Sequence, residues 1–120
     1  MGCLVQFLQG YLPSDIGIIL QNIKEFTIAN NQFAGSIPIS ISNASNLEIL
    51  GLNENKLSGE VQSLEKLNRI SSFSITLNNL GNGRENDLNF LCSLTNATYL
   101  TILAINVNNF GGEVPKCIGN

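Results

Sequence analysis

The chain has 120 residues, of which 43% are hydrophobic and 12% are charged, and its net charge is −3. Six Lys and Arg residues are scattered among nine acidic residues, so no basic patch exists and nucleic acid is an unsuitable partner. No apolar run reaches the roughly 18 residues of a membrane-spanning helix, so we expect no membrane contact by this segment itself. The absence of His removes His-based acid–base and metal sites, and we expect no metal and no cofactor.

The first 22 residues already read as part of a repeat, so we expect no signal peptide here. Met1-Gly2-Cys3 is similar to an acylation site, but Gln6 occupies the position where Ser or Thr is expected. A truncated start is the better interpretation. The segment Gly10-Tyr-Leu-Pro13 reads as the tail of a partial repeat, with Gln6 where later repeats carry Asn.

One phrase then recurs along the chain. It reads I-x-x-F-x-I-x-x-N-x-F-x-G-x-I-P at 23–38, and similar phrases occupy 47–61 and 100–115, with a weaker copy at 70–80. Successive Asn residues of the phrase are 24 (55 − 31), 23 (78 − 55) and 30 (108 − 78) residues apart. This is the leucine-rich-repeat pattern, whose usual period is about 20–29 residues.

The pattern predicts a single α/β solenoid of about four to five repeats. Residues 1–22 form a partial repeat, followed by repeats at 23–46, 47–69, 70–99 and 100–120. We expect short parallel strands on the concave face and a convex side of 3-10 or irregular structure with one short helix. Alternating residues such as Phe26 and Ile28 should point into the core from each strand.

The repeated Asn is expected to form a structural ladder through the solenoid, at Asn31, Asn55, Asn78 and Asn108. A buried amide can satisfy backbone groups of the turn and of the next coil, whereas Leu would leave them unpaired. The glycines that follow allow backbone angles that a side chain resists, at Gly35, Gly59 and Gly112. Pro38 and Pro115 fix φ where no ladder hydrogen bond is needed.

Repeat spacing varies at two places. The short step follows Val61-Gln62, where the Pro of the phrase is missing. The long step contains a loop at 81–86 that we expect to be flexible, and then Asp87 as a helix N-cap. Behind Asp87, an apolar stripe predicts a short convex helix through Leu88, Phe90, Leu91 and Leu94.

Several stretches resemble the plant-specific class of leucine-rich repeats, including Leu12-Pro-Ser-Asp-Ile-Gly and Leu57-Ser-Gly-Glu-Val. The long segment Asn79-Leu-Gly-Asn-Gly…Asn86-Asp-Leu-Asn-Phe-Leu-Cys-Ser-Leu is similar to a middle repeat in ectodomains of plant receptor-like serine/threonine kinases, including immune receptors. The resemblance implies a membrane receptor whose ectodomain, on the extracellular side of the plasma membrane, binds a peptide or protein ligand or a co-receptor.

Against that resemblance, the chain lacks a secretion signal, a paired-cysteine cap, a membrane span and a kinase domain. Gly81-Asn-Gly83 is a turn and not a kinase phosphate loop, so we do not expect an enzyme. A fragment, a truncated gene model or a degenerate copy is expected, and repeats without caps should expose an apolar end.

The cysteines and acids give no catalytic pattern. Cys3, Cys92 and Cys117 show no C-x-x-C spacing, and we expect small buried hydrophobic residues, with a Cys92–Cys117 disulfide as the lesser alternative. Asp15, Glu85 and Asp87 have no partner base at a readable spacing. We therefore interpret them as solvated loop or cap positions.

The repeat register selects variable residues for the concave strand face. They are Thr27, Ala29, Asn30, Gln32, Gly51, Asn53, Glu54, Lys56, Ser74, Thr76, Leu77, Asn79, Ala104, Asn106, Val107 and Asn109. This strip is mostly small and polar, with Glu54 and Lys56 as an opposite-charge pair. It suits hydrogen bonding to an extended peptide better than gripping a charged ligand, the alternative being a solvated face that touches nothing.

Two sequons, Asn43-Ala-Ser45 and Asn96-Ala-Thr98, lie at the same station of their repeats, four residues before Leu47 and Leu100. They predict convex-side glycosylation at Asn43 and Asn96 if the protein is secreted.

The amino-acid sequence leaves three functions open. The first is a peptide- or protein-binding segment of a receptor-like kinase ectodomain in signalling or defence. The second is a kinase-lacking secreted or membrane-tethered repeat protein, either a receptor-like protein or an enzyme inhibitor. The third is a non-functional remnant.

Overall fold

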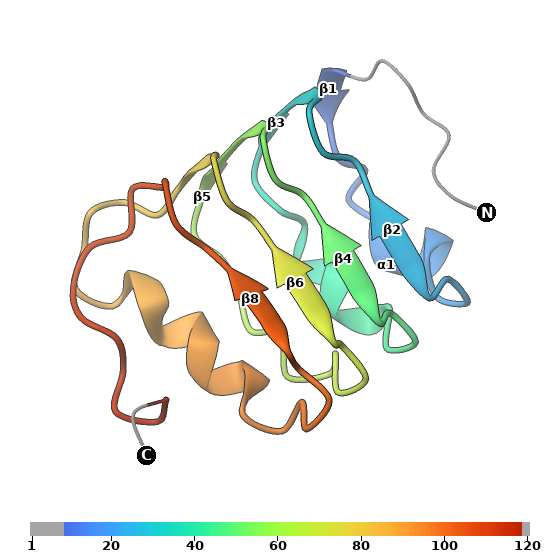
Figure 1. Ribbon diagram of the computed structural model, residues 1–120. Helices are drawn as coiled ribbons and strands as arrows, with labels where there is room; N and C mark the ends of the chain where they lie inside the picture. Colours follow the sequence, from blue (N-terminus) through green and yellow to red (C-terminus); the bar gives the residue numbers. More distant parts are fainter. Residues whose placement is uncertain (1–8, 119–120) are drawn as a thin grey trace.

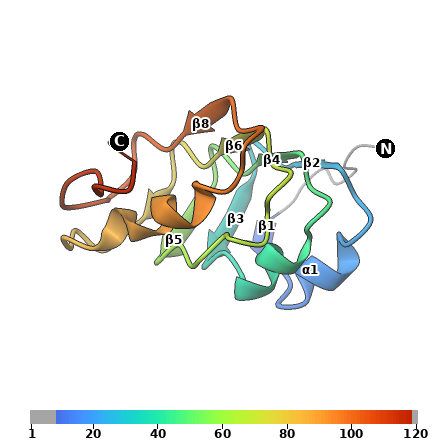
Figure 2. The same ribbon diagram turned by 90° about the horizontal axis from the view of Figure 1, so that it is seen from below.

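A computed structural model describes residues 9–118 of the chain. The expectations for Met1-Gly2-Cys3 and Gln6 lie outside the described residues. The elements in chain order are β1 (Gln9–Tyr11), α1 (Ile16–Ile19), β2 (Glu25–Thr27), β3 (Gln32–Gly35), η1 (Ile39–Asn43), β4 (Ile49–Gly51), β5 (Lys56–Gly59), β6 (Ser72–Ser74), β7 (Asn79–Leu80), η2 (Asp87–Leu94) and β8 (Ile102–Ala104). The helical turns lie on the side opposite to the sheet formed by β2, β4, β6 and β8 (Figure 1, Figure 2).

That sheet, called the main sheet below, has the order β2-β4-β6-β8 with every pair parallel. The middle residues of the strands are in register, from Phe26 through Leu50 and Phe73 to Leu103. Leu50 and Phe73 are each only 1% exposed, because they point away from solvent into the core. Each repeat from 23 onward therefore contributes one strand to the main sheet, and the solenoid architecture is confirmed.

A second sheet, β1-β3-β5-β7, was not expected from the sequence. Its strands are also parallel, and β3, β5 and β7 begin directly after a repeated Asn. Each contains only two to four residues and depends on pairing with the neighbouring coil. Gly35 and Gly59 end two of these strands with φ of +77° and +84°, in the left-handed region that glycine adopts without strain.

The repeated Asn joins neighbouring coils through backbone groups. The Asn78 amide donates to the carbonyls of Ile75 in its own turn (3.1 Å) and Leu52 in the preceding coil (3.0 Å). Its oxygen accepts from the Leu57 amide (3.0 Å), also in the preceding coil. The partner coil is thus the preceding one and not the next one.

The same pattern repeats at the adjacent rungs. Asn55 donates to the Ile28 carbonyl (3.1 Å) and accepts from the Phe33 amide (3.1 Å). Asn108 donates to the Ile75 carbonyl (2.8 Å) and accepts from the Leu80 amide (2.9 Å). Asn55 and Asn78 are buried, so these bonds are made away from water, where an unpaired backbone group is most costly.

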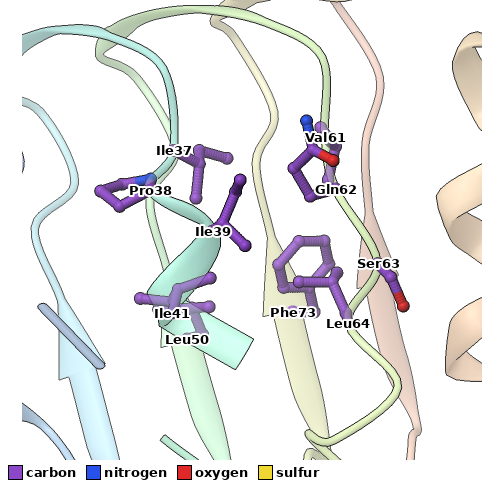
Figure 3. Close-up of a pocket in the computed structure, with 10 residues that line it drawn as sticks. All are labelled: Ile37, Pro38, Ile39, Ile41, Leu50, Val61, Gln62, Ser63, Leu64 and Phe73. Carbon is purple, nitrogen blue, oxygen red and sulfur yellow. The ribbon is translucent and has the colours of Figure 1, made fainter. Parts of the chain in front are cut away.

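The convex side differs from repeat to repeat. Pro38 precedes the 3-10 helix η1, whereas residues 61–64, which lack that Pro, form no helix. Between them lies an apolar crevice of about 10 Å³, lined by Ile41, Leu64 and Phe73 among others (Figure 3). It is too small for a ligand, so it is a gap in the packing where one helical turn is absent.

The long repeat contains the expected short helix, η2, which is 3-10 in character. Leu88, Phe90, Leu91 and Leu94 are all buried, which confirms the apolar stripe. The expected N-cap is wrong. The helix begins at Asp87 itself and Asn86 is the capping residue, without a side-chain cap bond.

A disulfide joins Cys92 to Cys117, with Cα atoms 5.6 Å apart. The expectation that these two cysteines are small buried hydrophobic residues is wrong, because Cys117 is exposed and its segment lies beside η2 (Figure 1). Such a bond is typical of proteins that fold in an oxidising compartment. It fastens the convex helix to the last described turn of the chain.

The Asn ladder makes one rung testable. Replacing Asn78 by Leu leaves the Leu57 amide and the Leu52 and Ile75 carbonyls without their partner, so we expect the free energy of unfolding to fall by about 3 kcal/mol or more. Chemical denaturation followed by circular dichroism measures it. Asn79→Ala, at the exposed neighbouring residue, is the matched control and should change stability little. Equal effects of the two substitutions would contradict the role of the ladder.

The disulfide closes a loop of 25 residues, which in the chain-entropy account stabilises the fold by about 3 kcal/mol. We expect the double substitution Cys92→Ala, Cys117→Ala to lower the guanidinium unfolding midpoint accordingly. A reducing agent should have the same effect on the wild-type chain and none on the double variant. The bond would be refuted by thiol titration in which the unreduced, denatured chain shows both cysteines reactive.

Candidate ligand-binding face

The outer face of the main sheet presents two rows of side chains, because the first and third residues of each strand point away from the core. The first row is Glu25, Ile49, Ser72 and Ile102, and the second is Thr27, Gly51, Ser74 and Ala104. All four residues of the second row were selected from the sequence. The first row was missed, although it lies two positions earlier in each strand and the period of two could have found it.

A third row continues beyond the strands, at Ala29, Asn53, Thr76 and Asn106, all selected from the sequence. Backbone bonds run across it, from the Asn30 amide to the Asn53 carbonyl (3.2 Å) and from the Leu77 amide to the Asn106 carbonyl (3.2 Å). The Thr76 hydroxyl donates to the Asn106 side-chain oxygen at 2.9 Å. Polar side chains of this row are thus partly ordered and partly exposed.

The next residue of every repeat has a left-handed backbone, with φ between 58° and 62°. This row, selected from the sequence and called the left-handed row below, is Asn30, Glu54, Leu77 and Val107. Asn tolerates this conformation, whereas Val is a poor residue for it. With its side-chain nitrogen turned toward the Glu54 carboxylate, Asn30 donates to both Glu54 oxygens, at 2.7 and 3.0 Å. Glu54 therefore engages Asn30.

The remaining selected residues lie elsewhere. Gln32, Lys56 and Asn79 are the first residues of β3, β5 and β7, so they belong to the second sheet and not to the main sheet. Asn109 occupies the equivalent station of the last repeat, and its side-chain nitrogen donates to the Asn79 carbonyl (3.4 Å). Their expected position on the main strand face is wrong because the chain turns sharply at the repeated Asn.

Both sequon asparagines are exposed. Asn43 is the last residue of η1, where its side-chain oxygen accepts from the Lys66 ammonium (3.3 Å), and Asn96 follows the end of η2. Because η1 and η2 lie opposite to the main sheet, a glycan at either position would leave the outward rows uncovered (Figure 2).

One polar hollow of about 460 Å³ lies where the chain enters the main strands. It is lined by Glu48, Arg69, Ser71 and Tyr99. None of these residues was selected from the sequence, because each falls just before the strand and not on it.

In the described part of the chain, no group of three metal-ligating side chains occurs and no helix is long and apolar enough to cross a membrane.

The sequence analysis interprets Asp87 as a solvated loop or cap position. In the structure it is instead a buried residue that holds the long repeat together. One oxygen of its buried carboxylate accepts from the amides of Asn82, Arg84 and Gly111, each at 3.0 Å. Burial would raise the pKa of Asp87, but backbone amides, that of Gly111 foremost, outweigh it and hold the pKa below its ordinary value. Asp87 thus ties the loop at 81–86 to the last repeat.

Comparison with known proteins agrees with this geometry. Residues 22–44 match the leucine-rich-repeat family. The chain is 34% identical over 95% of its length to receptor-like protein 41 of Arabidopsis thaliana, and 40% identical over 91% to a probable LRR receptor-like serine/threonine-protein kinase of the same plant. A solved structure of the plant peptide hormone receptor RGFR1 in complex with RGF2 superposes with a TM-score of 0.81 at 27% identity, over 93% of this chain and 17% of that one.

The chain is a plant-type leucine-rich-repeat array. It spans 15% of receptor-like protein 41 and 11% of the kinase relative, so it corresponds to a small part of either.

The hydrogen bonds of Asp87 give the array a defined pH response. Because the folded-state pKa is depressed, the carboxylate stabilises the fold above its unfolded pKa of about 3.9, and this contribution is lost as pH falls through that value toward the folded pKa. We expect Asp87→Asn to be less stable at neutral pH and to lose less stability on acidification. Unfolding curves at a series of pH values measure this.

Glu85→Gln, at an exposed neighbouring carboxylate, is the control and should follow the wild-type curve. Superimposable pH profiles of the wild type and Asp87→Asn would show that the three amide bonds do not depend on the charge.

Proposed function

We propose that this array is part of an ectodomain on the extracellular side of a plant plasma membrane, where it recognises a peptide or protein ligand or a co-receptor. The observation that carries the proposal is the set of three outward rows, held in register on an exposed face. The likeness to a peptide hormone receptor solved with its ligand supports it.

The chemistry of the rows suits an extended polypeptide. Small side chains in the second row, such as Ser74 and Ala104, allow close approach of a ligand backbone to the sheet. Asn53 and Asn106, in the third row, offer both donors and acceptors to its amides and carbonyls. Ile49 and Ile102, in the first row, add apolar contacts, and Ile102 is 55% exposed.

For the longer protein that contains such an array, we favour a receptor-like serine/threonine kinase. The second candidate is a receptor-like protein without a kinase, which the 34% identity to receptor-like protein 41 supports equally. Reading the coding sequence beyond Asn120 for a membrane span and a kinase domain separates the two. We also propose N-glycans at Asn43 and Asn96 during secretion.

The proposed face is testable on the chain itself. Ser74→Arg places a long cation in the centre of the second row, and Asn89→Arg, exposed on η2, adds the same side chain on the opposite side. We expect short synthetic peptides selected for binding to the wild-type chain to lose at least about tenfold in affinity for Ser74→Arg and little for Asn89→Arg. Titration by isothermal calorimetry gives both values. Equal losses for the two variants, or no peptide selected at all, would overturn the proposal.

A further inference from the structure

The polar hollow lies before the main strands, next to the first outward row and apart from the second and third. Glu48 and Ser71 immediately precede β4 and β6, and Arg69 and Tyr99 lie one residue before the opening apolar residues Ile70 and Leu100. Its volume of about 460 Å³ is within the range of small-molecule sites. The hollow thus lies at one end of the main sheet, across two successive gaps between coils.

One repeat earlier, the same station carries a side-chain bond between coils. Asn46, the residue equivalent to Arg69 and Tyr99, donates from its amide to the Gln21 carbonyl at 2.8 Å and so bridges its coil to the preceding one. Arg69 and Tyr99 make no such bridge, and both are exposed, Tyr99 to 68%. At the hollow the coils are joined by backbone bonds and by the Ser71 and Thr101 hydroxyls instead, and the side chains of Arg69 and Tyr99 are left to line it.

The lining presents donors and acceptors that the protein does not use. The Ser71 hydroxyl proton is committed to the Glu48 carbonyl at 3.0 Å, which leaves its lone pairs as acceptors. Within residues 9–118, no ion pair joins Glu48 to Arg69, so the carboxylate remains an acceptor and the guanidinium a donor. Tyr99 adds a hydroxyl that can do either, together with an exposed ring face.

This combination favours a ligand that is rich in hydroxyl groups and carries no net charge. Neighbouring hydroxyls can donate to the two carboxylate oxygens and accept from the fork of the guanidinium at the same time. Glu48 and Arg69 together carry no net charge, so the hollow gives neither an anion nor a cation a net Coulombic advantage over a neutral ligand rich in hydroxyl groups. The apolar face of a sugar ring can also cover the ring of Tyr99 and remove both from water.

We propose that the hollow lined by Glu48, Arg69, Ser71 and Tyr99 is a binding site for a neutral pyranose, either a monosaccharide or the terminal unit of a glycan. Arg69 donates to one pair of ring hydroxyls and Glu48 accepts from another. Ser71 accepts at the floor, and Tyr99 stacks against the ring. The site is distinct from the second and third outward rows, which lie further along the strands.

The test uses the full 120-residue chain labelled with ¹⁵N and titrated with methyl β-D-glucopyranoside, methyl α-D-mannopyranoside, glucuronate and glucosamine. We expect saturable shifts of the Ser71 and Tyr99 amide signals with at least one neutral glycoside, and weaker binding of both charged sugars. The Ser74 amide, in the second outward row, should not move. This distinguishes the hollow from the face proposed for peptides.

Matched variants assign the contacts. Tyr99→Ala and Arg69→Gln should weaken binding of the neutral sugar by at least about tenfold, and Arg84→Gln and Glu65→Gln, exposed residues outside the hollow, should not. Circular dichroism melting confirms that each variant remains folded. No binding of either neutral glycoside, tighter binding of a charged sugar, or equal losses in the hollow variants and their controls would overturn the proposal.

Discussion

The fold depends on the need to satisfy backbone groups that stacking buries between coils. A solenoid has no single globular core, so each turn leaves amides and carbonyls facing the adjacent turn and not water. The repeated Asn meets this need with one side chain, because its amide nitrogen reaches two carbonyls and its oxygen accepts an amide across the gap. At Asn55 and Asn78 these groups are buried, so water could not replace the side chain.

Because the coils that carry Asn55, Asn78 and Asn108 are each fixed to the preceding coil by the same bonds, the main strands are held in register and their outward residues form rows. The long repeat preserves this register although it contains extra residues, because the additional chain is placed on the convex side. There it is held by buried apolar residues of η2, by the amide bonds to Asp87 and by the disulfide. The face that carries the candidate ligand contacts is therefore insulated from variation behind it.

The spacing of residues within one segment was sufficient to predict the elements whose side chains alternate or repeat at a fixed interval. The strands, the positions of the repeated Asn and the apolar stripe of η2 each follow from the spacing of apolar residues along one segment. The second sheet could not be found in this way, since its short strands resemble turns and exist only through pairing with the neighbouring coil. The same holds for the Cys92–Cys117 bond and for the amides around Asp87, where the partners are brought together by loop geometry.

The candidate sites divide along the same line. The second and third outward rows were found by counting along the repeat, and the first row was available to the same count. The hollow was not, because its lining residues come from successive coils and are brought together only by the stacking of those coils. Asn46 and Arg69 occupy equivalent positions in the sequence pattern, and only the three-dimensional arrangement shows that Asn46 bonds to the preceding coil whereas Arg69 lines the hollow.

The left-handed row carries a consequence for how such surfaces diversify. A residue other than Gly or Asn in this conformation costs about 1–2 kcal/mol, yet Glu54, Leu77 and Val107 occupy it beside the candidate ligand face. Each residue other than Gly or Asn at this row therefore lowers the free energy of unfolding of the whole array. Lineages with a firmly held scaffold can therefore explore more recognition chemistry at this row than lineages whose scaffold is marginal.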